Sequence, residues 1–183
     1  TEPSRFPWIR TCELGPDLCY VEGFNALAYH PDLQITRSRR QWFFDVANEW
    51  AAVVDDLESD LEHAYRLHLH SSRIEPQGEG AYLFRAQEEA LHLRLLPGQP
   101  TTCAVTPPEL VLSYTFNYTH VKGGAKLTGD AGMESHRPPE IDRLVCRAEG
   151  RRRSAHFLTV FSPHPFEAGR EGETLTVRTP LGE

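Results

Sequence analysis

Apolar and polar residues alternate over short stretches of this chain, and turn-forming residues separate the stretches. Between residues 89 and 96, Leu91, Leu93 and Leu95 share one side of an extended chain, while His92 and Arg94 share the other. Successive side chains of a strand point to opposite faces, so this pattern predicts a half-buried strand. Fourteen prolines and thirteen glycines punctuate the chain at intervals typical of an all-β fold.

The repetition of this pattern predicts an all-β protein, an antiparallel β-sandwich of about 10–12 strands. The expected strands cover residues 18–29, 36–45, 50–56, 63–71, 81–86, 89–96, 101–106, 110–119, 142–149, 154–161 and 173–178. A chain of 183 residues without an internal repeat or low-complexity linker suits a single domain, 1–183. Within it, we expect a long loop over 121–140 and a peripheral tail over 168–183.

The segment 48–65 admits two interpretations. Trp50, Val53, Val54 and Leu57 recur at steps of three and four residues, which is typical of an amphipathic helix, and Asn48 could cap it. The alternative is a hairpin, with a strand over 50–56, an acidic turn over 55–60 and a strand over 63–71. The strict alternation of the last stretch favours the hairpin, because it places Tyr65, Leu67 and Leu69 on one face and Arg66, His68 and His70 on the other.

The net charge of −7 argues against nucleic acid as a partner, because phosphate binding needs a basic surface. No apolar run approaches the length of a membrane span, so no membrane partner is expected. The single methionine and the excess of arginine over lysine indicate a high-GC bacterial gene. The spacing of the four cysteines fits no zinc motif. Cys12 and Cys19 are close enough for a small loop disulfide, while Cys146 lies in an apolar run and is expected to be a buried small hydrophobe.

Arginines supply the first candidate binding site. Arg37 and Arg39 share a face of the strand expected over 36–45, and a guanidinium can bind the carboxylate of an acidic sugar through two hydrogen bonds. We therefore predict that they bind substrate. Arg40 points to the opposite face. The acidic pair Asp55 and Asp56 offers a competing role for these arginines, namely internal ion pairs.

The pair His68 and His70 supplies the second candidate site. On a strand both imidazoles point to the same side, and Glu75 follows at the spacing of the metal motif HxHxxxxE in cupins. This spacing makes a cupin-like enzyme with a divalent metal the alternative function. The glycines that flank the cupin motif are missing, and Arg66 shares the histidine face. The simpler interpretation is that these histidines belong to a polar face of a sheet. Apart from this possible metal, no cofactor is expected.

Four stretches in a fixed order resemble the C-terminal β-sandwich domain of heparinase II/III-like polysaccharide lyases. They are DLCYVEG with AY (17–23 and 28–29), RSRRQWFF (37–44), WAAVVDDL followed by EHAYRLHLH (50–57 and 62–70), and AHFLTVFSP (155–163). The resemblance implies strand–turn–strand for 50–71. It also implies an accessory role in a lyase that cleaves uronate-containing polysaccharide by β-elimination.

The chain departs from the family in having no helical toroid, where most of the family's catalytic residues lie. No catalytic residue can therefore be assigned, and the isolated chain is expected to be inactive. The expected partners are an acidic polysaccharide or the catalytic toroid domain, with Arg37, Arg39, His68 and His70 as the substrate contacts. A stand-alone carbohydrate-binding module is a further alternative.

Overall fold

The computed structural model describes residues 8–106, 118–122, 125–129 and 141–182. Its elements are β1 (Trp8–Leu14), β2 (Leu18–Phe24), the 3-10 turns η1 (Ala26–Ala28) and η2 (Pro31–Leu33), β3 (Ile35–Asp45), β4 (Trp50–His63), β5 (Arg66–Ser71), β6 (Arg73–Gly78), β7 (Ala81–Ala86), β8 (Glu89–Leu95), β9 (Thr101–Thr106), β10 (Tyr118–Lys122), β11 (Ala125–Gly129), β12 (Asp142–Ala148), β13 (Arg152–Ser162), β14 (Glu167–Glu171) and β15 (Thr174–Arg178). The all-β class is therefore confirmed. Among these residues, no helix has the length and apolarity that a membrane crossing requires.

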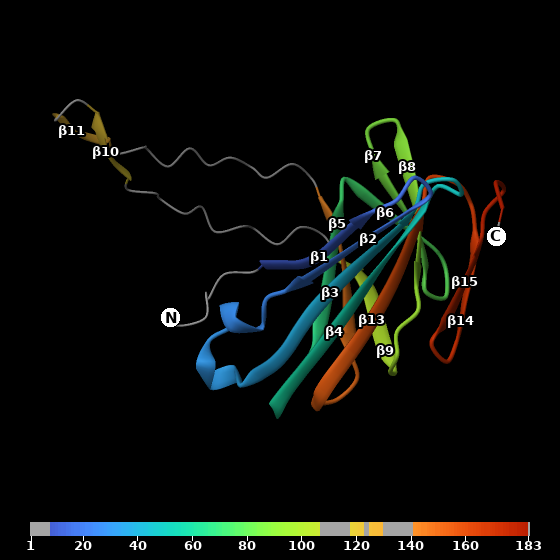
Figure 1. Ribbon diagram of the computed structural model, residues 1–183, viewed down its shortest axis with the longest axis horizontal. Helices are drawn as coiled ribbons and strands as arrows, with labels where there is room; N and C mark the ends of the chain where they lie inside the picture. Colours follow the sequence, from blue (N-terminus) through green and yellow to red (C-terminus); the bar gives the residue numbers. More distant parts are fainter. Residues whose placement is uncertain (1–7, 107–117, 123–124, 130–140, 183) are drawn as a thin grey trace.

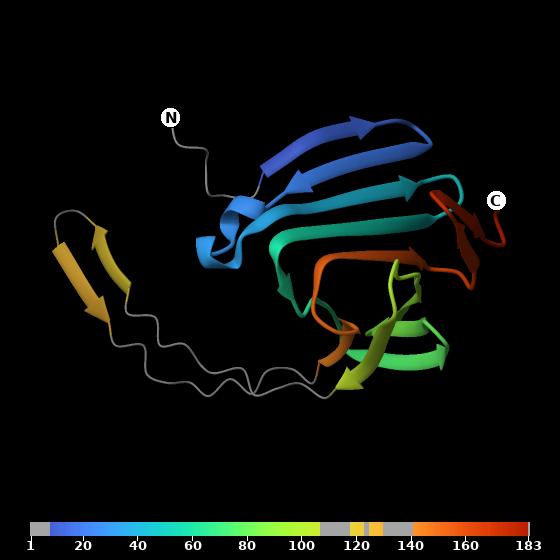
Figure 2. The ribbon, with the colours of Figure 1, turned by 90° about the horizontal axis from the view of Figure 1, so that it is seen from below.

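The strands form a large sheet with a smaller layer on each face. The large sheet has the order β1-β2-β3-β4-β13-β8-β7-β6, the small sheet has the order β5-β12-β9, and β14 pairs with β15 in a hairpin. All the paired strands are antiparallel, and Figures 1 and 2 show β1 to β4 and β13 lying side by side. The β10–β11 pair is a separate antiparallel sheet.

Two hydrophobic clusters hold these layers together. Between the large and the small sheet, Phe157, Leu93 and Leu144 are at most 2% exposed. On the other face of the large sheet, Val160 and Ala52 pack against Val177 of β15. The tail that was expected to be peripheral thus supplies a buried side chain, since Val177 is 4% exposed.

The segment 50–71 is neither a helix nor a hairpin, which corrects both interpretations of the sequence. β4 is one strand of 14 residues that pairs with β3 on one side and β13 on the other. β5 leaves the large sheet and pairs with β12 in the small sheet. The expected acidic turn is strand because Asp55 and Asp56 lie opposite Arg40 and Arg39 of β3, so their charges are matched within the sheet.

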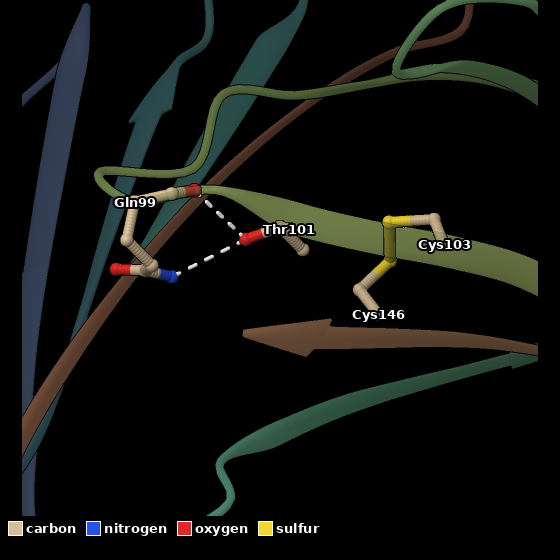
Figure 3. The surroundings of a disulfide bond; sticks show 4 residues. All are labelled: Gln99, Thr101, Cys103 and Cys146. Atoms are coloured by element: carbon tan, nitrogen blue, oxygen red, sulfur yellow. Dashed lines mark hydrogen bonds between the residues drawn. A yellow bond between two sulfur atoms is a disulfide. The ribbon is translucent and has the colours of Figure 1, made fainter. Parts of the chain in front are cut away.

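Other differences lie at the ends of elements and in the cysteines. The strand expected over 18–29 ends at Phe24, and β1, β6, β14 and β11, which lies inside the expected loop 121–140, were not predicted. Most of the expected strand 110–119, and most of the expected loop 121–140, fall outside the described residues. Cys103 of β9 forms a disulfide with Cys146 of β12, as Figure 3 shows, while Cys12 and Cys19 have free thiols. Cys12 lies opposite Val21 rather than Cys19, so the β1–β2 register does not bring the two together.

Candidate functional site

A ladder of polar side chains crosses β3, β4 and β13 on the face of the large sheet that carries the β14–β15 hairpin. The register places Arg39, Asp56 and His156 in one row, and Arg37, Glu58 and Ser154 in the next. Apolar residues of the same strands continue this face toward the hairpin, where Ala52, Val54 and Leu158 pack against β14 and β15. The ladder is thus the polar continuation of a face that is otherwise core.

Asp56 is the centre of the ladder. The Arg39 Nε donates to Asp56 Oδ2 at 3.0 Å, Arg39 Nη2 donates to the same oxygen, and His156 Nδ1 lies 2.5 Å from Oδ1. Burial disfavours the charged form of Asp56, but the hydrogen bonds from Arg39 and His156 outweigh it and lower the pKa of the carboxyl. The hydrogen bond to Asp56 likewise raises the pKa of Arg39. Asp56 therefore stays ionised at pH values below the range in which an ordinary aspartate becomes protonated.

A second carboxylate, Glu22 of β2, lies on the other side of Arg39. Arg39 Nη1 is 3.6 Å from Glu22 Oε2, which also accepts hydrogen bonds from the Tyr20 hydroxyl at 3.1 Å and the Gln41 amide at 3.3 Å. Glu22 is 7% exposed. Arg39 is consequently held between two carboxylates, so much of its charge is compensated inside the protein.

Beside the ladder lies a hollow of about 580 Å³. Its lining includes Arg37 and Arg39 from β3, Phe43 and Trp50 from the large sheet, and Arg170 from β14. Arg37 pairs with Glu58, and both side chains remain close to half exposed, at 48% and 45%. An exposed pair of this kind contributes little to stability, so its guanidinium can exchange partners with a dissolved carboxylate at small cost.

Arg40 does not belong to this site. It points to the opposite face of the large sheet, where its Nε lies 2.5 Å from Asp55 Oδ1 and its guanidinium lies 6.0 Å from the Trp42 ring centroid. The competing interpretation, in which these arginines form internal ion pairs, is therefore correct for all three of them. That geometry does not test whether Arg37 and Arg39 bind substrate.

His68 and His70 lie in a different layer. Because Tyr65 and Leu67 face the core, the two histidines point outward from the small sheet, where both are exposed. The large sheet separates them from Arg37 and Arg39, so the four predicted contacts form two sites rather than one. Glu75 lies on β6 within reach of two guanidinium groups, at 3.1 Å from Arg73 and 3.2 Å from Arg85.

The predicted metal site thus has its carboxylate already engaged by cations. Within the described ranges, no group of three or more His, Cys, Asp and Glu side chains is arranged to hold a metal ion. Divalent metal binding by His68, His70 and Glu75 stays a prediction.

Sequence reasoning missed Glu22 and His156 as members of the ladder. His156 contacts Asp56 across 100 residues of sequence, and Glu22 reaches Arg39 only through the β2–β3 register. The alternation of 154–161 predicted a strand but gave no partner for it. A polar residue on an otherwise apolar face was the available signal, since His156 shares its face of the strand with Leu158 and Val160.

Comparisons with known proteins identify the fold. No family model matches this sequence, and no curated protein matches it. The structure is similar to the heparinase III BT4657 gene product (TM-score 0.61, 13% identity, 96% of this chain), to another crystal structure of heparinase III (0.58, 15%, 94%) and to heparan sulfate lyase HepC from Pedobacter heparinus (0.57, 13%, 96%).

This chain spans 26% of the length of each of these three proteins. The fold implied by the resemblance in the sequence, a heparinase III-like β-sandwich, is confirmed. At this level of identity the likeness is one of fold.

Proposed function

We propose that this chain is the β-sandwich domain of a polysaccharide lyase that cleaves uronate-containing chains by β-elimination, and that the catalytic groups lie on a helical partner domain. One observation carries the proposal. The likeness to heparinase III structures extends over 94–96% of this chain, yet it accounts for only 26% of those proteins. The chain then corresponds to a domain of such an enzyme, which packs on the rest and contributes contacts to the polysaccharide.

The chemistry of the ladder supports a contact role rather than a catalytic one. β-Elimination needs a base next to the carbon acid and a group that neutralises the uronate carboxylate. The His156 ring nitrogen that faces the ladder is engaged by Asp56, and the Tyr20 hydroxyl is engaged by Glu22 and Gln41. Arg37 has an exposed guanidinium beside a hollow, which suits a uronate carboxylate.

The substrate contacts in this proposal are Arg37 and Arg39 on one outer face, and His68 and His70 on the other. A polysaccharide is long enough to contact both a face of this domain and the cleft beside it. The position of the partner domain decides which face of this domain lines that cleft. Both pairs therefore enter the proposal as separate, individually testable contacts.

The test compares the 183-residue chain with the complete product of its gene. Each is incubated with heparan sulfate, alginate and neutral dextran, and the ultraviolet absorbance of the unsaturated uronate product is followed. We expect the complete product to cleave at least one of the acidic polysaccharides and the 183-residue chain to cleave none. Elimination by the isolated chain would refute the assignment of catalysis to another domain. A complete product that has no helical domain and binds without cleaving would replace the proposal by a stand-alone carbohydrate-binding module.

A further inference from the structure

A second hollow, of about 810 Å³, shares Arg170 of β14 with the hollow beside the polar ladder. It is bounded by the turn between β6 and β7, the end of β8, the start of β9 and the tip of the β14–β15 hairpin. Arg94 of β8 and Arg170 of β14 both line it. Arg94 points to this side because its neighbours Leu93 and Leu95 are buried in the core between the two sheets.

Arg94 lacks the partners that a half-buried guanidinium normally has. Its Nε is buried, and no acceptor among the described residues satisfies it. Its neighbours on the adjacent strands are Val160 and Ala81, neither of which carries a charge. Burying an unpaired charge costs free energy, so a buried donor without an acceptor requires an explanation, and a bound anion is one that fits a guanidinium.

Two further residues that carry hydrogen-bond donors line the same hollow. Arg170 donates through its Nε to the Gly172 carbonyl at 2.9 Å, and within the described part of the chain it has no carboxylate partner. Tyr82 is 7% exposed, and burial raises the pKa of its hydroxyl, which therefore remains a hydrogen-bond donor. The described residues offer this hydroxyl no acceptor. One carboxylate, that of the exposed Glu79, lines the hollow.

One part of the lining is held in place covalently. Thr101 and Cys103 of β9 line the hollow, and the disulfide to Cys146 fixes β9 against β12 (Figure 3). The Thr101 hydroxyl is in turn held by the Gln99 carbonyl at 3.0 Å. A guanidinium group in such a hollow can bind a small planar or tetrahedral anion through two parallel hydrogen bonds.

We propose that this hollow is an anion-binding site, with Arg94 as its central ligand, and that it takes the carboxylate or sulfate group of an acidic sugar. The preference for an anion follows from the unpaired Arg94 guanidinium and from Arg170, which has no carboxylate partner among the described residues. The identification of the anion's carrier as a sugar rests on the proposed function. Both groups offer planar or tetrahedral oxygens that accept two hydrogen bonds from one guanidinium, so the site recognises their shared chemistry.

The test titrates the 183-residue chain with glucuronate, glucose 6-sulfate, inorganic sulfate and neutral glucose, and measures binding by calorimetry. We expect saturable binding of glucuronate or glucose 6-sulfate. Comparing these two titrations identifies which anion the site prefers. Arg94→Met should weaken this binding at least tenfold, because it removes the charged hydrogen-bond donor at the centre of the site. Glu79→Gln should strengthen it, because it removes the carboxylate of the hollow. Arg147→Met, which removes an exposed arginine from β12, is the matched control and should bind as the parent does.

Thermal stability separates this role from a structural one. If Arg94 serves a ligand, Arg94→Met removes a half-buried unpaired charge and should leave the melting temperature unchanged or higher. A marked loss of stability would show that Arg94 is a structural residue and would overturn the proposal. Equal binding of neutral glucose, absence of any anion binding, or undiminished binding by Arg94→Met would overturn it as well. These outcomes leave the proposed function standing, because that is decided by elimination activity of the complete gene product.

Discussion

Asp56→Asn offers the sharpest test of the polar ladder, because the variant keeps the shape of the side chain and removes its charge. In the folded protein the carboxylate accepts hydrogen bonds from Arg39 and His156, and the side chains of Asp56 and Arg39 are 17% and 31% exposed. These exposures lie between the surface case, where a pair contributes about 0–1 kcal/mol, and the buried case, where breaking it costs about 3–5 kcal/mol. We expect the free energy of unfolding to fall by about 2 kcal/mol.

Urea unfolding followed by circular dichroism measures this loss. For a chain of this length, it corresponds to a decrease of about 6 °C in melting temperature. Glu58→Gln is the matched control, because it removes the carboxylate of the next row, where the pair with Arg37 is 45–48% exposed. Its loss should stay below about 1 kcal/mol. The reasoning fails if the two variants lose the same amount, or if Asp56→Asn is as stable as the parent.

The pH dependence gives an independent check. The pKa of Asp56 is lowered in the folded protein, so the folded state binds this proton less readily than the unfolded state does. The contribution of the charge is complete above about pH 4, the ordinary range of an aspartate, and is lost as the pH falls through the lowered pKa. The difference in stability between the parent and Asp56→Asn should therefore shrink as the pH falls below about 4. A difference that persists undiminished at the lowest pH would show that the carboxylate charge is not its source.

Two further predictions concern the cysteines and the predicted metal site. Titration of the native protein with a thiol reagent should detect two thiols, with exposed Cys12 reacting before half-buried Cys19, and two more after reduction and unfolding; four reactive thiols without reductant would contradict the disulfide. For the metal, protein purified without added metal and then dialysed against zinc should retain none beyond the level of a His68→Ala/His70→Ala variant, because the Glu75 carboxylate is engaged by two arginines. If the parent retains stoichiometric zinc and the variant does not, the result would support the metal site and contradict this expectation.

Some elements were predictable because one side of the strand is core and the other is not. β8 and β5 are of this kind, and the alternation over 63–71 and 89–96 identified Leu93, Leu95, Tyr65 and Leu67 as buried residues, whereas Leu91, expected on the same side as Leu93, is 37% exposed. β4 was ambiguous for the opposite reason. It lies in the middle of the large sheet with both faces covered, so apolar residues occupy adjacent positions and the period of two disappears.

The candidate site was predictable only in part, because it depends on register. The sequence showed that Arg37 and Arg39 share a face and that Asp55 and Asp56 carry opposite charge, which was enough to raise the ion-pair alternative. It could not show that β13 lies next to β4, so His156 had no visible connection to Asp56. The segregation of His68 and His70 from the arginines was hidden for the same reason, since β5 joins a different sheet from β4.

The disulfide has a consequence for the covalent continuity of the chain. Cys103 and Cys146 enclose the whole stretch between β9 and β12, and Thr106 lies opposite Arg143 where the two strands meet. Thr106 and Arg143, near the two ends of this stretch, are therefore neighbours in the small sheet, with a covalent bond behind them. A peptide bond hydrolysed anywhere inside that stretch leaves two polypeptides that remain one molecule until the disulfide is reduced. A protease that cuts there would alter the migration of the protein on a reducing gel and leave its mass on a non-reducing gel almost unchanged.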